Sequence, residues 1–347
     1  MPTRRKSLFR WGAVAVVLAV VAAAVVLGNR WWRDASRTDL ERAVAMAPRD
    51  AEQLSWTDWS GVREELGTDD VDELLERGFE ADLTQSTALG DSAAVLEDTF
   101  GFSPATVDWE LFSQSEKGAV VMLHLPDSAD FDAIAGILGE IGYAEPDSAT
   151  GTWVGSDDLL VRAGGVTPEL TYLRLDEERG LLMGSDTQAY LEDAAADARD
   201  ESGPAGLDDV VAASGDPLTA AIYTGDHACA KLAMSQADPI DQEKAAALVR
   251  QAGKVNPVAG FAISVTSRGD VRVVMSFESE GQARANADTR AELARGPAPG
   301  EGGDFTDLFD LGKVTADGNV VTMELEPIEG SYTFSSLKDG PLLFATC

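Results

Sequence analysis

The sequence predicts an α+β fold. It comprises an N-terminal transmembrane helix, a small helical region and two tandem ferredoxin-like units of the order β-α-β-β-α-β, which either stand apart or share one sheet. Three observations predict this organisation. A long apolar run lies near the N-terminus, strand and helix patterns alternate from about residue 118 onward, and their order in 113–200 returns in 217–347.

Acidic residues dominate the chain beyond its N-terminus. Of 347 residues, 27 are Lys or Arg and 60 are Asp or Glu, which gives a net charge of −33. The first 33 residues hold six basic residues and no acid, so residues 34–347 carry 21 − 60 = −39. Such a body repels phosphate backbones, which excludes nucleic acid as a partner. A hydrophobic content of 44% is too high for a disordered acidic protein.

The apolar run predicts a signal anchor over 8–32, preceded by a basic cytoplasmic tail over 1–7. Its uncharged centre, 11–28, would form a helix about 27 Å long, close to the thickness of a bilayer core. Basic residues are more numerous before the run than after it, so we expect a single-pass plasma-membrane protein with its N-terminus in the cytoplasm and its acidic body outside. A cleaved signal peptide is the alternative. The residues assigned to the anchor and its ends are Trp11, Leu27, Trp31 and Trp32.

The next segment, 33–112, is predicted to be mainly helical. Leu54 and Trp56 alternate with polar residues as in a short strand. A helix is expected from Asp69 to about residue 83, because apolar residues recur there at helical spacing after an acidic first turn. A further helix over 92–100 is expected to end at Gly101.

The first α+β unit is assigned to 113–200. An apolar run over 119–125 predicts a buried strand, and an amphipathic pattern over 130–141 predicts a helix. Further strands are expected at 152–155, 159–163, 170–176 and 180–184, followed by a helix at 187–198. Residues 201–216 are rich in Gly, Pro, Ser and Asp and are interpreted as a linker.

The second α+β unit is assigned to 217–347 and includes a C-terminal tail. The order of elements resembles that of the first unit. Strands are expected at 218–223, 261–265, 271–277 and 320–325, and helices at 226–236, 239–252 and 281–294.

The two cysteines, Cys229 and Cys347, are predicted to form a disulfide, since an even count outside the membrane favours pairing. Two buried free thiols are the alternative. The sequence predicts no metal site and no cofactor, because it has only two histidines and no C-x-x-C pattern.

The search for catalytic motifs leaves enzymatic activity uncertain and favours a non-enzyme. His124 and His227 are interpreted as structural, and the chain has no G-x-S-x-G elbow and no phosphate-binding loop. The series Asp304, Asp307 and Asp310 beside a Gly-rich loop offers oxygen ligands suited to Ca²⁺, although a solvated acidic face is the simpler interpretation.

Tryptophans provide one functional hypothesis. Tryptophan faces can stack on sugar rings, and acids beside them could contact or cleave a glycan. A hydrophobic seam between the helical region and the sheet is the competing interpretation. The residues of the hypothetical groove are Trp56, Asp58, Trp59, Trp109 and Glu110.

Several short segments resemble those of uncharacterised single-span exported proteins of high-GC bacteria. They are Trp56-Thr57-Asp58-Trp59, Phe102-Ser103-Pro104, Asp108-Trp109-Glu110 and the terminal stretch 340–347. The resemblance implies a location in the envelope and no particular activity.

We therefore expect a membrane-anchored extracytoplasmic protein that acts as a non-enzymatic binding or assembly module of the cell envelope. Its expected partners are the membrane and an envelope protein or wall glycan. The alternatives are a cell-wall glycan hydrolase that uses carboxylates such as Asp58 and Glu110, and a cation-dependent structural module.

Overall fold

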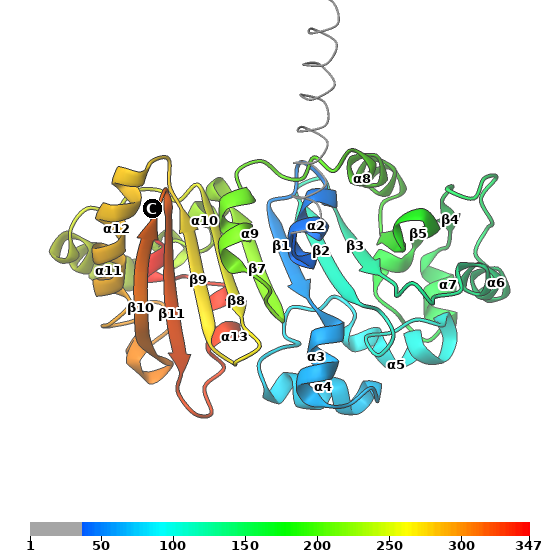
Figure 1. The fold of residues 1–347 in the computed structure, drawn as a ribbon, viewed down its shortest axis with the longest axis horizontal. Coiled ribbons are helices and arrows are strands. Elements are labelled where there is room, and N and C mark those ends of the chain that lie inside the picture. Colours follow the sequence, from blue (N-terminus) through cyan, green and yellow to red (C-terminus); the bar gives the residue numbers. More distant parts are fainter. Residues whose placement is uncertain (1–36) are drawn as a thin grey trace, which may run out of the picture.

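The computed structural model describes residues 37–347, which build an 11-stranded sheet in the order β10-β11-β9-β8-β7-β1-β2-β3-β6-β5-β4. Figure 1 shows the sheet face-on, with β10 at the left and β4 at the right. The strands are β1 (Gln53–Thr57), β2 (Trp109–Ser115), β3 (Gly118–His124), β4 (Trp153–Val154), β5 (Tyr172–Asp176), β6 (Leu181–Ser185), β7 (Thr219–Thr224), β8 (Gly260–Val265), β9 (Val271–Ser276), β10 (Phe309–Asp317) and β11 (Val320–Pro327).

Helices cover both faces of this sheet. They are α2 (Asp39–Met46), α3 (Trp59–Leu66), α4 (Val71–Glu80), α5 (Ala93–Val95), α6 (Phe131–Ile141), α7 (Asp157–Arg162), α8 (Gln188–Asp200), α9 (Asp208–Ser214), α10 (Gly225–Lys231), α11 (Pro239–Ala252), α12 (Glu280–Leu293) and α13 (Thr333–Lys338). The fold class is therefore α+β with a large antiparallel sheet, as the sequence predicts.

The predicted tail (1–7) and anchor (8–32), with Trp11, Leu27, Trp31 and Trp32, lie outside the described residues. Within 37–347, no helix has both the length and the apolar character needed to cross a membrane.

The two halves of the sheet repeat one another outward from the central pair β1 and β7. These strands run antiparallel, with Ser55 opposite Ala221 at the middle of the pairing. On one side follow β2, β3, β6 and β5, and on the other follow β8, β9, β11 and β10. In both halves a helix follows the third strand: α6 after β3, and α12 after β9. The two halves thus share one sheet and are related by a local two-fold axis, but the first half begins at β1, within the segment 33–112 that was predicted to be a separate helical region.

The expected ferredoxin-like order is wrong. In that arrangement the strands of a β-α-β segment are parallel and separated by another strand. In the second predicted unit, β7 pairs directly and antiparallel with β8, although α10 and α11 lie between them in the chain. In the first predicted unit, β3 and β5 flank α6 and are parallel with β6 between them, but the unit ends at α8 without the final strand. The sequence reading also missed β2 and β10. Polar residues such as Glu110 and Lys313 interrupt the apolar patterns of these strands, which hid them.

Each face of the sheet has its own hydrophobic core. One core lies beneath α2, α8 and α9, where Leu40, Leu191 and Val210 are buried. The larger core lies on the opposite face and includes Trp59 of α3, Ile134 of α6 and the aromatic residues of the C-terminal segment. Because consecutive strand residues point to opposite faces, neighbouring residues of one strand enter different cores.

Several helices begin at a residue whose side chain caps the first turn. Asp70, Asp130 and Ser279 each accept a hydrogen bond from a backbone N–H in the first turn of the helix that follows. The same signal explains a wrong prediction. Residues 159–163 were expected to form a strand, but the Ser156 hydroxyl caps α7 by accepting from the backbone N–H of Leu159. The segment interpreted as a linker, 201–216, includes α9, which packs on β8 and β9.

The cysteine prediction is confirmed. Cys229 of α10 and Cys347 form a disulfide with Cα atoms 5.6 Å apart. A second contact holds the same end of the chain. The fully buried guanidinium of Arg290 donates to the backbone carbonyl oxygens of Phe344 and Asn256. The C-terminal segment is therefore fastened to the fold by a disulfide and by hydrogen bonds, including that of the Leu342 N–H to the carbonyl oxygen of Leu232.

Candidate functional site

The residues of the predicted glycan groove do not form a groove. Trp56 and Trp109 lie in the core beneath α2, α8 and α9, at 1% and 4% exposure. Their rings are 5.4 Å apart, and the Trp109 ring stacks on the imidazole of His124 at 5.2 Å. The indole N–H of Trp56 donates to the carbonyl oxygen of Pro217. Neither tryptophan has a face free for a sugar ring.

Trp59 and Glu110 lie on the other side of the sheet. Glu110 follows Trp109 in β2, so its side chain points to the opposite face. Its carboxylate accepts hydrogen bonds from the Trp59 indole N–H at 3.0 Å, the Thr87 hydroxyl at 2.6 Å and the backbone N–H of Ala88 at 2.6 Å. Burial raises the pKa of Glu110, while these donors counteract the rise.

Asp58 has a structural role at the start of α3. Its carboxylate accepts from the backbone N–H of Gly61 at 2.9 Å and from the Ser60 hydroxyl at 2.8 Å. Burial raises the pKa of Asp58, and the nearby carboxylates of Asp216 and Asp39 raise it further. The groove hypothesis is therefore corrected. Strand alternation divides its tryptophans and Glu110 between two cores, and Asp58 caps a helix.

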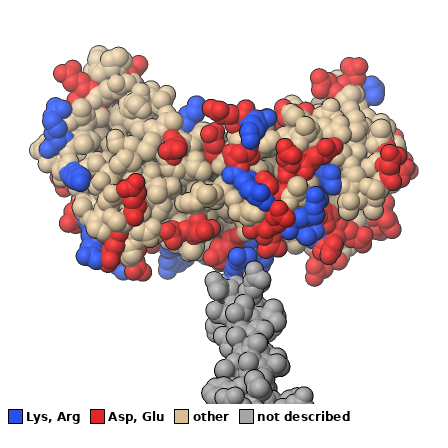
Figure 2. All heavy atoms as spheres, turned by 90° about the horizontal axis from the view of Figure 1, so that it is seen from above, with Lys and Arg blue, Asp and Glu red and all other residues tan. Residues whose placement is uncertain are grey.

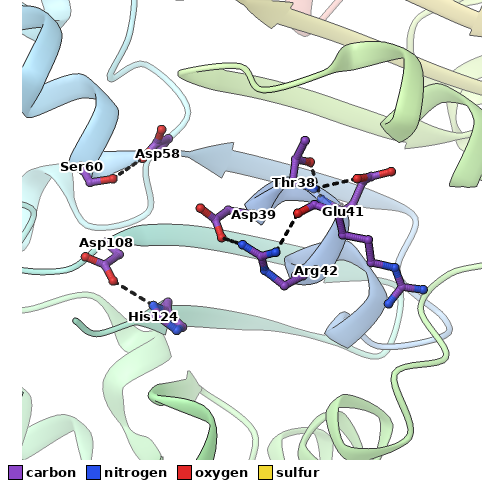
Figure 3. A network of polar contacts seen from close by, with 9 residues as sticks. Thr38, Asp39, Glu41, Arg42, Asp58, Ser60, Asp108 and His124 are labelled. Carbon is purple, nitrogen blue, oxygen red and sulfur yellow. Dashed lines mark hydrogen bonds and ion pairs between the residues drawn. The ribbon is translucent and has the colours of Figure 1, made fainter. Parts of the chain in front are cut away.

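A histidine–carboxylate pair lies beside this region. The Nδ1 atom of His124 is 3.1 Å from a carboxylate oxygen of Asp108, and Figure 3 shows the two side chains pointing toward each other from adjacent strand ends. The Ser60 hydroxyl is directed to Asp58 instead, as the same view shows. A serine hydrolase would need the hydroxyl bonded to the imidazole. The pair thus orients His124 against Trp109 and is not joined to a nucleophile.

Two residues of the acidic series Asp304, Asp307 and Asp310 have a local structural role. Asp304 and Asp307 form a reciprocal capping arrangement around a single 3₁₀ turn. Across residues 37–347, no group of three or more His, Cys, Asp or Glu side chains is arranged to hold a metal ion.

A cleft with a volume of about 790 Å³ lies at the β4 end of the sheet. This size is within the range of small-molecule and peptide sites. Its walls come from the start of α6, the segment 145–150, β4, the end of β5 with the following turn, and the end of α8. The lining residues are Phe131, Asp132, Ala135, Glu145, Pro146, Asp147, Ser148, Ala149, Thr150, Trp153, Arg174, Leu175, Asp176, Glu177, Glu178, Arg179 and Arg199.

Charged side chains of both signs surround this cleft. Three arginines and six acids line it, a balance of 3 − 6 = −3. Arg179 pairs with Asp176 at 3.1 Å, and Arg174 donates to the carbonyl oxygen of Thr150. Burial lowers the pKa of Arg174, and the nearby Arg199 lowers it further. Figure 2 shows acidic side chains over both ends of the molecule.

The sequence reading assigned none of the residues of this cleft to a site. Trp153, which is not among the residues of the hypothetical groove, lines the cleft. The arginines come from β5, the following turn and α8, segments separated in the chain. Their convergence depends on how β5 and α8 pack, which no local pattern of the sequence indicates.

Comparisons with known proteins add little. No protein-family model matches the chain, and no curated protein matches it. The fold is similar to crystal form I of TP0453, at 8% identity and a TM-score of 0.42, over 88% of this chain and 100% of that chain. Crystal form III of TP0453 gives 9% identity and the same TM-score, over 85% and 96%. At this TM-score, neither similarity contributes to a functional assignment.

Proposed function

We propose that this chain is a membrane-anchored extracytoplasmic binding module of the cell envelope, and that it binds a partner at the cleft between α6, β4 and β5. The cleft is the observation that carries this proposal. It combines the apolar surface of Phe131 and Trp153 with fixed polar groups, as ligand sites do.

The location rests on two further observations. The apolar run of 8–32 and its basic flank favour an anchor with the body outside. The disulfide between Cys229 and Cys347 suits an oxidising compartment. Neither Asp58 nor Glu110 lines the cleft. These two carboxylates, on which the hydrolase hypothesis depends, therefore could not act together on a substrate bound there.

The test is photocrosslinking in intact cells with the full-length chain. A photoreactive residue replaces Ser148, an exposed position that lines the cleft. A matched control carries it at Asp317, an exposed residue at the opposite end of the sheet. We expect a discrete protein adduct from position 148 and none from 317. Identical patterns from both positions, or no adduct at 148, would contradict the proposal.

Two outcomes of the same experiment concern the alternatives. An adduct at 148 that is removed by a glycan-cleaving enzyme would make wall glycan the partner. Fractionation of the same cells tests the anchor, because a shortened chain that lacks the N-terminal apolar run and is found in the soluble extracellular fraction would indicate a cleaved signal peptide.

A further inference from the structure

The two edges of the sheet are built differently. At one edge, β10 runs for nine residues and has an irregular register between Leu311 and Val314. It also carries exposed charges at Asp310 and Lys313. Bulges and charged residues on an edge strand prevent another chain from pairing with it. This edge is therefore protected.

The opposite edge is incompletely covered. The terminal strand β4 has only two residues, and they pair with Leu173 and Tyr172 of β5. Strand β5 continues to Asp176, and its last three residues pair with β6 on the inner side. Within the described residues, no strand lies on the outer side of Arg174, Leu175 and Asp176.

Backbone groups along this stretch have no backbone partner on the outer side among the described residues. In an antiparallel strand, the N–H and C=O of successive residues point alternately to the two sides. At least one of three consecutive residues therefore directs both groups away from β6. Among residues 37–347, no backbone hydrogen bond outside the strand ladders reaches Arg174, Leu175 or Asp176. The cleft of about 790 Å³ opens beside them, with Leu175 and Asp176 in its wall.

The charge of the cleft selects the kind of segment that fits. Two of its three arginines are already engaged, Arg179 with Asp176 and Arg174 with Thr150. Glu177 and Glu178 are exposed at the end of the open edge, and Glu145 and Asp147 are exposed on the facing segment. These acids attract cationic side chains and repel anionic ones.

We infer that the open edge of β5 at Arg174–Asp176 receives an extended, Lys- or Arg-bearing segment of another envelope protein as an added strand. Backbone hydrogen bonds supply affinity in such pairing, and side chains on alternate positions supply specificity. This inference rests on the proposed function, since it names the partner class of the same cleft.

The test measures hydrogen exchange of the full-length chain in detergent micelles, with and without a synthetic nine-residue peptide of alternating Val and Lys. We expect exchange of the backbone amides in 173–177 to slow by about tenfold at saturation, with no change in β10. A peptide with N-methyl groups on alternate backbone nitrogens, which cannot pair as a strand, should lose this protection. A peptide with Glu in place of Lys should bind at least about tenfold more weakly.

Variants separate charge from backbone pairing. Glu177→Lys with Glu178→Lys should weaken binding of the Val–Lys peptide about tenfold. The matched control is Glu64→Lys with Glu65→Lys, an exposed adjacent pair on α3, and it should bind like the parent chain. Equal protection by the N-methylated peptide, or no protection of 173–177, would overturn the added strand. In that case a protein adduct at position 148 in cells would still support the proposed binding function. Absence of that adduct would contradict both the added strand and the binding function.

Discussion

The carboxylate of Asp82 accepts a hydrogen bond of 2.7 Å from the backbone N–H of Phe334, a residue 252 positions further along the chain. It also accepts from the backbone N–H and hydroxyl of Ser335. Asp82 follows α4 and is only 8% exposed, while Phe334 and Ser335 belong to the first turn of α13. One side chain of the first half thus caps a helix of the second half and joins the two across their seam.

We predict that Asp82→Asn lowers the free energy of unfolding by about 1–3 kcal/mol, because an amide group would face donors that need an acceptor. Asp82 has a φ of 60°, which asparagine also tolerates, so the substitution tests the hydrogen bonds and not the backbone. Urea denaturation measures the change. The exposed residue Asp91 provides the control, and Asp91→Asn should alter stability by less than about 0.5 kcal/mol. Equal changes in stability for the two variants would show that the hydrogen bonds of Asp82 do not stabilise the contact between the two halves.

The buried carboxyl of Glu110 predicts a dependence of stability on pH. Its pKa in the folded state is raised above the ordinary 4.5, so the folded state binds the proton more tightly than the unfolded state. The contribution of this group is greatest below pH 4.5 and declines as the pH rises through the raised pKa. Glu110→Gln removes the titration. Its stability relative to the parent should therefore improve as the pH rises from below 4.5 toward neutrality.

Chemical denaturation of both proteins across this pH range measures the difference. Glu116→Gln, at an exposed position of the β2–β3 turn, is the control and should follow the parent at every pH. Parallel curves for Glu110→Gln and the parent would mean that Glu110 does not titrate differently on folding.

The disulfide predicts a large loss of stability on reduction. It joins residues 118 positions apart, and closing so long a loop stabilises a fold by about 4–5 kcal/mol in the chain-entropy model. The double variant Cys229→Ala and Cys347→Ala should lose about this much in urea denaturation. The parent chain with a reducing agent should match the variant. An unchanged midpoint on reduction would contradict the prediction.

Substitution of glycine by alanine should have opposite effects on stability at two positions of the first half. An added Cβ at Gly184 of β6 would lie 2.6 Å from the carbonyl oxygen of Glu169, so Gly184→Ala should destabilise by about 1–3 kcal/mol. An added Cβ at Gly139 of α6 meets no atom within 4 Å. Gly139→Ala should stabilise by up to about 1 kcal/mol, because alanine is the better helix former. Thermal unfolding of both variants measures the contrast, and changes of the same sign would contradict it.

Local sequence signals predicted much of the secondary structure. Predominantly apolar runs identified β3, β8 and β9, because strands near the centre of this sheet are buried on both faces. The amphipathic pattern over 130–141 identified α6. These signals are read within a few residues, so no knowledge of the rest of the chain was needed. The anchor over 8–32 remains a prediction of the same kind.

By itself, the sequence determined the α+β class, the acidic body and the pairing of its two cysteines, because composition and local periodicity carry that information. Tertiary structure alone decided which strands are neighbours, and with them the face on which each tryptophan lies. A shift of one position along β2 would exchange Trp109 for Glu110, and the sheet pairing that sets this order depends on residues far apart in the chain. The cleft beside β5 arises in the same way, since it is assembled from α6, β5 and α8 and from the two-residue length of β4.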